Sequence, residues 1–328
     1  MIIAIDETGD FNESSERLNL FIAIQIRQRK TLYRQKHDEF CSWEASIDRS
    51  LKNHKGEIKT SSLSDDQLFD FARRVMAGAV PVGITPLAIR PADNPPSVFD
   101  KHCAVKLIGI RAGVDWYRKQ GRASLARTYE ELGNWFEKLN YQQRMKILLL
   151  GTCIADSFTN AIGHSITGKY DSELTRIRFK VDRDFVREPR TEIFWRELLR
   201  NELYFRSVEQ PIPILKEWEK NGHPFLDMYR KNGRFDFNLL FRKNCGFENS
   251  HEHFEIRIAD AVNTIFSRFL NDRRCGRAYN LVRHCILRDG HVQQFVLKDF
   301  DLSSYRYDPS KNPFGPMSDE PTDVADSP

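Results

Sequence analysis

Aspartates at the ends of predicted strands are the residues in this chain best placed to do chemistry. Asp6 and Glu7 follow the apolar run Ile2-Ile3-Ala4-Ile5, which predicts a buried strand. Asp182 and Asp184 end a second strand candidate, in which apolar and basic residues alternate. A buried carboxylate costs on the order of several kcal/mol unless it is paired, hydrogen-bonded or metal-bound. These acids are therefore candidates for a functional site.

Two further acids stand on elements that can reach those strand ends. Asp260 lies on the flank of the amphipathic helix predicted from His251 onward, beside its buried stripe. Glu57 opens the helix that is predicted to follow the first strands. Lys59, two residues beyond it, either contacts a phosphate or pairs with an acid, and the sequence leaves both open.

Carboxylates gathered from distant parts of a chain repel one another, and divalent cations offset that cost. Two Mg²⁺ or Mn²⁺ ions, roughly 3.5–4 Å apart, activate a water and stabilise the leaving oxygen of a phosphodiester. The acids therefore predict a metal-dependent site for phosphodiester hydrolysis.

Other interpretations of the same residues stay open or are disfavoured. Asp6 taken alone is equally well interpreted as a turn acid that caps Gly9. A haloacid-dehalogenase-type phosphatase needs a second aspartate where this chain has Thr8, and a sugar kinase needs glycine-rich phosphate loops that the sequence lacks. His251 and His253 point in different directions on a helix, which favours a solvated helix start over a shared transition-metal ion.

Composition and charge describe a soluble protein with a sizeable core. The chain has 328 residues, 40% of them hydrophobic and 29% charged. The longest apolar run, 147–150, is far shorter than a membrane span, and the N-terminus lacks the features of a signal peptide, so we expect a cytoplasmic protein without a membrane partner. Six scattered cysteines without a C-x-x-C pair predict reduced thiols.

The net charge of +4 divides unevenly along the chain. Residues 308–328 carry −4, so the rest carries +8, which is compatible with a nucleic-acid partner. The segment 27–36 is basic, with Tyr33 among the charges, and is interpreted either as a solvated helix face or as a nucleic-acid contact. The tail from Asp308 is rich in proline and acids and is predicted to be disordered.

Hydrophobic periodicity places the acids among alternating strands and helices. It predicts strands over 18–26, 81–90 and 175–185, with the first of these forming a hairpin with the opening strand. A capping box at Ser64 starts a helix, three helices occupy 97–172, and others cover 191–205 and 251–266. A strand candidate spans 235–241, and an edge hairpin is predicted over 285–300 with its turn at Asp289-Gly290.

Four short motifs, in this order, resemble those of the domain of unknown function 3800 family, which is similar to the ribonuclease H-like superfamily. They are Ile-Asp-Glu-Thr-Gly-Asp at 5–10, Gly-Glu-Ile-Lys-Thr-Ser at 56–61, Val-Asp-Arg-Asp at 181–184 and Ile-Ala-Asp-Ala-Val at 258–262. The first departs from the family pattern, since Thr8 replaces the usual serine.

The resemblance covers roughly residues 1–270 and implies an α/β fold, a ribonuclease H-like mixed sheet flanked by helices, with the helices of 97–172 as an insertion. We expect this single domain to extend over 1–307. It implies that Asp6, Glu57, Asp182 and Asp260 bind Mg²⁺ or Mn²⁺, with Glu7 and Asp184 as substitute or supporting acids. The expected function is a nuclease acting on DNA or RNA, and the expected context is phage defence. The alternative is a non-catalytic scaffold or sensor subunit of a multi-protein defence system.

Overall fold

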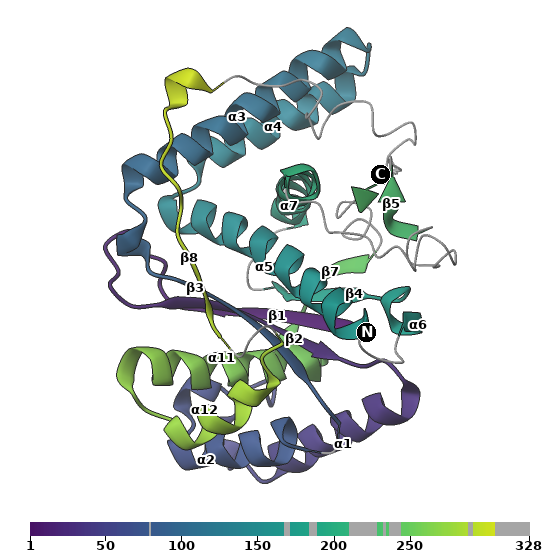
Figure 1. Cartoon of the computed structure of the whole chain (residues 1–328), viewed down its shortest axis with the longest axis vertical. Helices are drawn as coiled ribbons and strands as arrows, with labels where there is room; N and C mark the ends of the chain where they lie inside the picture. Colours follow the sequence, from purple (N-terminus) through teal and green to yellow (C-terminus); the bar gives the residue numbers. More distant parts are fainter. Residues whose placement is uncertain are drawn as a thin grey trace.

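A six-stranded mixed sheet forms the centre of the protein, in the order β7-β4-β1-β2-β3-β8 (Figure 1). The structure, a computed structural model, describes residues 1–78, 80–166, 171–183, 189–209, 228–231, 234–235, 244–287 and 291–305. The strands of the sheet are β1 (Ile2–Thr8), β2 (Asn19–Ile26), β3 (Gly83–Ile89), β4 (Arg178–Asp182), β7 (Cys245–Glu248) and β8 (Gln293–Phe295). The prediction of an α/β fold with a mixed sheet flanked by helices is confirmed.

Strands β1 and β2 form the predicted antiparallel hairpin, with Asp6 opposite Ile22. The connection turns at Gly9, whose φ is +128°. A Cβ atom there would lie 1.7 Å from Asn19 Oδ1, so a larger residue does not fit. The same Oδ1 accepts a hydrogen bond from the backbone N–H of Phe11 at 3.2 Å. The glycine of the opening motif therefore serves the hairpin.

Strand β4 lies parallel to β1, and β7 lies parallel to β4. The last paired residues of β1 and β4 are Ile5 and Val181. Asp6 and Asp182 follow them directly, so these two acids leave neighbouring strands at the same edge of the sheet. Parallel pairing needs a long crossover, and the helices between β3 and β4 supply it.

Helices cover both faces of the sheet (Figure 1). One face carries α1 (Lys30–Ala45), α2 (Asp65–Phe71), α11 (Phe254–Asp272) and α12 (Gly276–Val282). The other carries α3 (Pro96–Lys119), α4 (Ala123–Lys138), α5 (Tyr141–Ile166) and α7 (Pro189–Glu209). The described residues also form the short helix α6 (Asp171–Leu174), the strand pair β5 (Arg230–Lys231) and β6 (Arg234–Phe235), and short 3₁₀ or π-helical turns that include Thr60–Ser62 and Ala72–Met76. Each face of the sheet buries its own apolar cluster because side chains alternate along the strands.

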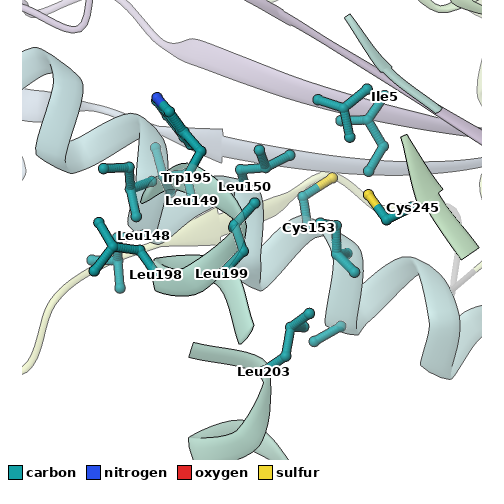
Figure 2. Packing of buried hydrophobic residues seen from close by; sticks show 14 of the residues in the cluster. Ile5, Leu148, Leu149, Leu150, Cys153, Trp195, Leu198, Leu199, Leu203 and Cys245 are labelled. Carbon is teal, nitrogen blue, oxygen red and sulfur yellow. The ribbon is translucent and has the colours of Figure 1, made fainter. Parts of the chain in front are cut away.

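Helix α5 is part of the main core. Figure 2 shows Leu149, Leu150 and Cys153 of α5 in the apolar cluster that also contains Ile5 of β1 and leucines of α7. Among the described residues one segment, Tyr141–Gly163 within α5, is long and apolar enough to span a membrane, and 78% of its most apolar stretch is buried inside the protein. Burial against the sheet explains that apolar composition.

Most of the predicted elements are found, and the edge hairpin is wrong. Ile286 bridges to Ile84 in the parallel sense, and β8 also lies parallel to β3, so both segments run in one direction along the same edge. The prediction relied on local turn residues, which do not show that both segments can instead pair with the open edge of β3. Of the strand predicted over 235–241, only Phe235 lies within the described residues, and the tail 308–328 lies outside them.

The basic segment 27–36 has two different environments. Arg29 and Arg34 are exposed, as a solvated helix face requires. Lys36 is buried, and its Nζ donates to Glu39 Oε2 at 2.6 Å and to the backbone oxygen of Val75. Lys36 therefore links α1 to the helical segment Ala72–Met76, which contains Val75, and is not accessible to a nucleic acid. The six cysteines are free thiols, as predicted.

Ser64→Ala is expected to lower the free energy of unfolding by about 1 kcal/mol. Ser64 Oγ accepts the backbone N–H of Gln67 at 3.2 Å, and the Gln67 side chain accepts the backbone N–H of Ser64 at 2.8 Å. Urea unfolding of the wild type and the variant measures the loss. Ser62→Ala is the control, because Ser62 does not cap α2, and an equal loss in both variants would contradict the capping contribution.

Candidate functional site

Asp6 lies inside the protein near the end of β1, with 7% of its surface exposed. Its Oδ2 accepts a hydrogen bond at 3.2 Å from Nδ2 of Asn263, a residue of α11. Alternation along the strand turns Asp6 toward α11, because Ile5 belongs to the opposite apolar cluster. Asp6 is thus held by a distant helix and does not act as a simple turn acid at Gly9.

Asp182 ends β4 beside Asp6 and is half-buried. It pairs in parallel register with Glu248, the last residue of β7, so both side chains lie on the same face of the sheet. Glu248 also pairs with His253 Nε2 at 3.3 Å. Three neighbouring parallel strands therefore each carry an acid at or near the same end: Asp6 in β1, Asp182 in β4 and Glu248 in β7.

Asp260 reaches the same region from α11, the helix that packs against β1 and β2. It lies one turn before Asn263, so both residues occupy the same side of the helix. A hydrogen bond from the Thr60 side chain holds Asp260, and Thr60 Oγ1 also lies 2.7 Å from Thr264 Oγ1. The predicted helix is confirmed, and it begins at Phe254 instead of His251.

Glu7 points to the other face of the sheet, toward the helical segment 97–172. Its Oε1 accepts a hydrogen bond from Lys146 Nζ of α5 at 2.9 Å, and both side chains are largely buried. The same ammonium lies 5.2 Å from the centre of the Phe11 ring. Lys146 therefore places a cation directly beside Glu7.

Glu57 does not open a helix, and that part of the prediction is wrong. It lies in a turn closed by the bridge between Lys52 and Ile58, and its Oε2 accepts from Asn53 Nδ2 at 3.1 Å. Its charge nevertheless acts on Asp260. The turn forms because Gly56, with φ +78°, reverses the chain just before Glu57.

Lys59 is exposed and precedes the short 3₁₀ helix Thr60–Ser62. Its side chain has no hydrogen bond or ion pair to the part of the chain that the structure describes, so neither of its two interpretations is decided. Asp184 lies outside the described residues.

The acids raise one another's pKa. Burial raises the pKa of Asp6 well above its usual value, and the charges of Asp260, Glu7 and Asp182 raise it further. The pKa of Asp260 is raised to about 7 by burial and by Glu57 and Asp182, against the hydrogen bond from Thr60. Such mutual repulsion in one buried place is the electrostatic pattern of a functional site.

Glu7 shares this raised pKa despite its lysine partner. Burial raises it to about 7, Lys146 acts in the opposite direction, and Asp182 adds repulsion. An open pocket of about 190 Å³ lies over the site. Glu57 and Asp182 line it together with basic side chains, among them Lys55, Arg183 and His251. Asp6 and Asp260 do not line this pocket, so the acids that a polar ligand would meet in it are Glu57 and Asp182.

The donor set suits a hard divalent cation. Carboxylate and amide oxygens are the ligands that Mg²⁺ and Mn²⁺ prefer. Asn263 Oδ1 is buried next to Asp6 and has no hydrogen-bond partner in the described part of the chain. Within the same residues no three acids, histidines or cysteines are already arranged with the spacing of a metal site. The chemistry of the residues therefore fits the ion, and its binding would require them to draw closer.

The two histidines do not share a site. His253 Nδ1 lies 3.0 Å from Lys180 Nζ, and its other nitrogen pairs with Glu248. His251 pairs with Glu252 at 3.5 Å and lies in a separate 3₁₀ turn. This arrangement agrees with the interpretation of the segment as a helix start.

Sequence reasoning missed Lys146, Asn263, Thr60 and Glu248. Asn263 had a usable signal, because a polar residue three positions after Asp260 must share its helix face. Thr60 lies in the quoted motif at 56–61, but its contact with Asp260, like the positions of Lys146 and Glu248, depends on how distant elements pack.

Replacing Lys146 with methionine is expected to lower the free energy of unfolding by about 1–3 kcal/mol near pH 8, because a buried carboxylate loses its partner. Near pH 5 the loss should be smaller, because Glu7 is then protonated. Urea unfolding at both pH values measures this difference. The double variant Glu7→Gln/Lys146→Met should recover most of the loss near pH 8, and an equal loss at both pH values would contradict the role of the ion pair.

Comparisons with known proteins identify no relative of this chain: no family model matches it, and neither the curated proteins nor the solved structures contain a match.

Proposed function

We propose that the protein is a divalent-metal-dependent nuclease that hydrolyses phosphodiester bonds of DNA or RNA. The observation that carries the proposal is the convergence of Asp6, Asp182 and Asp260 from β1, β4 and α11: the charges of Asp182 and Asp260 act on Asp6, and the charge of Asp182 also acts on Asp260. A stable protein does not need this arrangement, because each buried charge weakens the fold. A bound cation would turn the repulsion into attraction.

The same placement supports a ribonuclease H-like fold as a proposal. In that superfamily the resemblance expects acids on the first strand, on a helix, on the fourth strand and on the final helix, and Glu57, which lies in a turn, does not match the second of these. Here Asp6 lies on β1, Asp182 on β4, and Asp260 on α11. The resemblance to the domain of unknown function 3800 family is part of this proposal, as is a role in phage defence with protein partners.

Each residue has a defined part in the proposed reaction. Asp6, Asp182 and Asp260 would hold Mg²⁺ or Mn²⁺, and the loop acid Glu57 lies close enough to act on Asp260. A bound ion of this kind lowers the pKa of the attacking water and stabilises the leaving oxygen.

The amide of Asn263 and the ammonium of Lys146 each support one of the acids. Asn263 orients Asp6 through the 3.2 Å hydrogen bond, and Lys146 balances the charge of Glu7. The open pocket beside Asp182 is where a scissile phosphate would enter. Its basic side chains, including Lys55 and Arg183, would contact the flanking phosphates.

Cleavage assays with the purified protein test the proposal. Single-stranded and duplex DNA and RNA are incubated with Mg²⁺, with Mn²⁺ or with EDTA, and products are resolved on denaturing gels. We expect cleavage with either metal and none with EDTA. The absence of cleavage on all four substrates, in a protein that also fails to bind Mn²⁺ in calorimetry, would favour the scaffold or sensor instead.

A further inference from the structure

A second pocket, of about 550 Å³, lies at the opposite end of β4 from the acids. Three cationic residues line it, Arg176, Arg178 and Lys180, and no acidic residue does. The aromatic side chain of Tyr33 forms part of its wall, and Ile2 and Ile177 supply apolar surface. Its lining therefore favours an anion that also carries apolar or aromatic surface.

Two of the three cations are available to a ligand. Arg176 and Arg178 are exposed, and neither guanidinium has a hydrogen bond or ion pair to the described part of the chain. Many other arginines among the described residues pair with acids, for example Arg257 with Glu44 and Arg268 with Asp65. Two neighbouring guanidinium groups without acids repel each other and attract a phosphate, which each of them can bind in a bidentate manner.

The third cation, Lys180, is held in position by a buried carboxylate. Lys180 Nζ donates to Glu255 Oε1 at 3.0 Å, and that carboxylate is completely buried. The hydroxyl of Tyr33 donates to the same oxygen. Glu255 therefore orients both a cation and an aromatic ring at the pocket, while its second oxygen has no partner among the described residues.

The pocket and the acids are aligned along one strand. Arg178, Lys180 and Asp182 alternate with the core residues Phe179 and Val181, so all three lie on the α11 face of the sheet. At roughly 3.3 Å per residue, Arg178 lies about 13 Å from Asp182. In a duplex, with about 3.4 Å per nucleotide of each strand, that distance corresponds to about four nucleotides.

We propose that this pocket binds a backbone phosphate of the nucleic-acid substrate about four nucleotides away from the bond that is cut, with Tyr33 against a base or sugar. The inference rests on the proposed function, because it assigns the pocket to the same substrate. Arg176 and Arg178 would then position the strand and would not take part in the chemical step.

Binding without cleavage tests the pocket separately from the activity. Fluorescence anisotropy is measured with labelled DNA and RNA of about 20 nucleotides, in EDTA, on the Asp6→Asn background. The variant Arg176→Gln/Arg178→Gln is compared with Arg122→Gln/Arg127→Gln, which removes the same charge from exposed residues at the start of α4. We expect a loss of affinity of about tenfold or more, and a salt dependence whose slope is smaller by about 1–2, in the first pair alone.

Two results would contradict the proposal that the pocket binds a backbone phosphate. One is an equal effect of both arginine pairs on the affinity, and the other is no binding of any oligonucleotide. Metal-dependent cleavage by the wild-type protein together with either result would leave the proposed nuclease function standing. If oligonucleotide binding depends on Arg176 and Arg178 but the wild-type protein does not cleave, the proposed hydrolytic function is wrong and the proposed nucleic-acid site stands.

Discussion

Asp6→Asn is expected to reduce the rate of metal-dependent cleavage by at least about 100-fold. Loss of a residue that only supports a metal ligand can already reduce activity by up to about that factor, so loss of a ligand should cost at least as much. The substitution preserves the shape of the side chain and removes its charge. Asp6 is buried between Asn263 and the charges of Asp260 and Asp182, so water cannot replace it as a charged ligand. The initial rate of cleavage at saturating Mn²⁺ measures the effect.

The matched control is Asp115→Asn, which makes the same chemical change at an exposed position of α3. Its side chain is 70% exposed and lies 3.8 Å from Arg118 in a surface pair. Cleavage by this variant should equal that of the wild type. If Asp6→Asn cleaved as fast as Asp115→Asn while folded, the acids would have a structural role and the scaffold alternative would be favoured.

The elements that carry the three principal acids could be predicted because each has a strong local pattern. The β-branched run before Asp6, the strict alternation before Asp182 and the apolar stripe beside Asp260 each set the period of a buried strand or helix. The structure brings the three acids near enough for their charges to interact, although no three acids, histidines or cysteines among the described residues have the spacing of a metal site. Whether they bind metal stays a prediction.

What the sequence could not provide were contacts between elements distant in the chain. Lys146 sits on an apolar core helix, and only the packing of α5 on the sheet brings it to Glu7. Glu57 was expected at a helix start, but Gly56 makes a turn there. The parallel edge strand β8 was interpreted as a hairpin, because local turn residues say nothing about which open edge a strand will join.

The second large effect is expected in the pH dependence of stability. Burial and mutual repulsion raise the pKa of Asp6, Glu7 and Asp260, the last two to about 7. The folded protein therefore holds these protons more tightly than the unfolded chain does. Their contribution to stability is fully present below about pH 4 and is lost as the pH rises through about 7, because folding must then keep buried charges close together.

The metal-free protein should lose on the order of 2–4 kcal/mol of unfolding free energy from this cluster between about pH 5 and pH 8. Urea unfolding in EDTA measures the change. The double variant Asp6→Asn/Asp260→Asn keeps two of the acids neutral at every pH, so its stability should fall less over the same interval. Equal pH slopes in wild type and variant would show that the acids do not repel one another in the folded protein.

Addition of Mn²⁺ near pH 8 should reverse the loss in the wild type, because the ionised carboxylates then gain a cation instead of only each other. A ligand that binds only the folded state at about 100 times its dissociation constant adds about 2.7 kcal/mol of stability. Near pH 5 protons compete for the same oxygens, so the stabilisation by metal should be smaller. The double variant should respond weakly at either pH. Stabilisation by Mn²⁺ that is independent of pH, or that is equal in the wild type and the double variant, would show that the ion binds elsewhere on the protein. The repulsion among the acids would then be unrelated to metal binding.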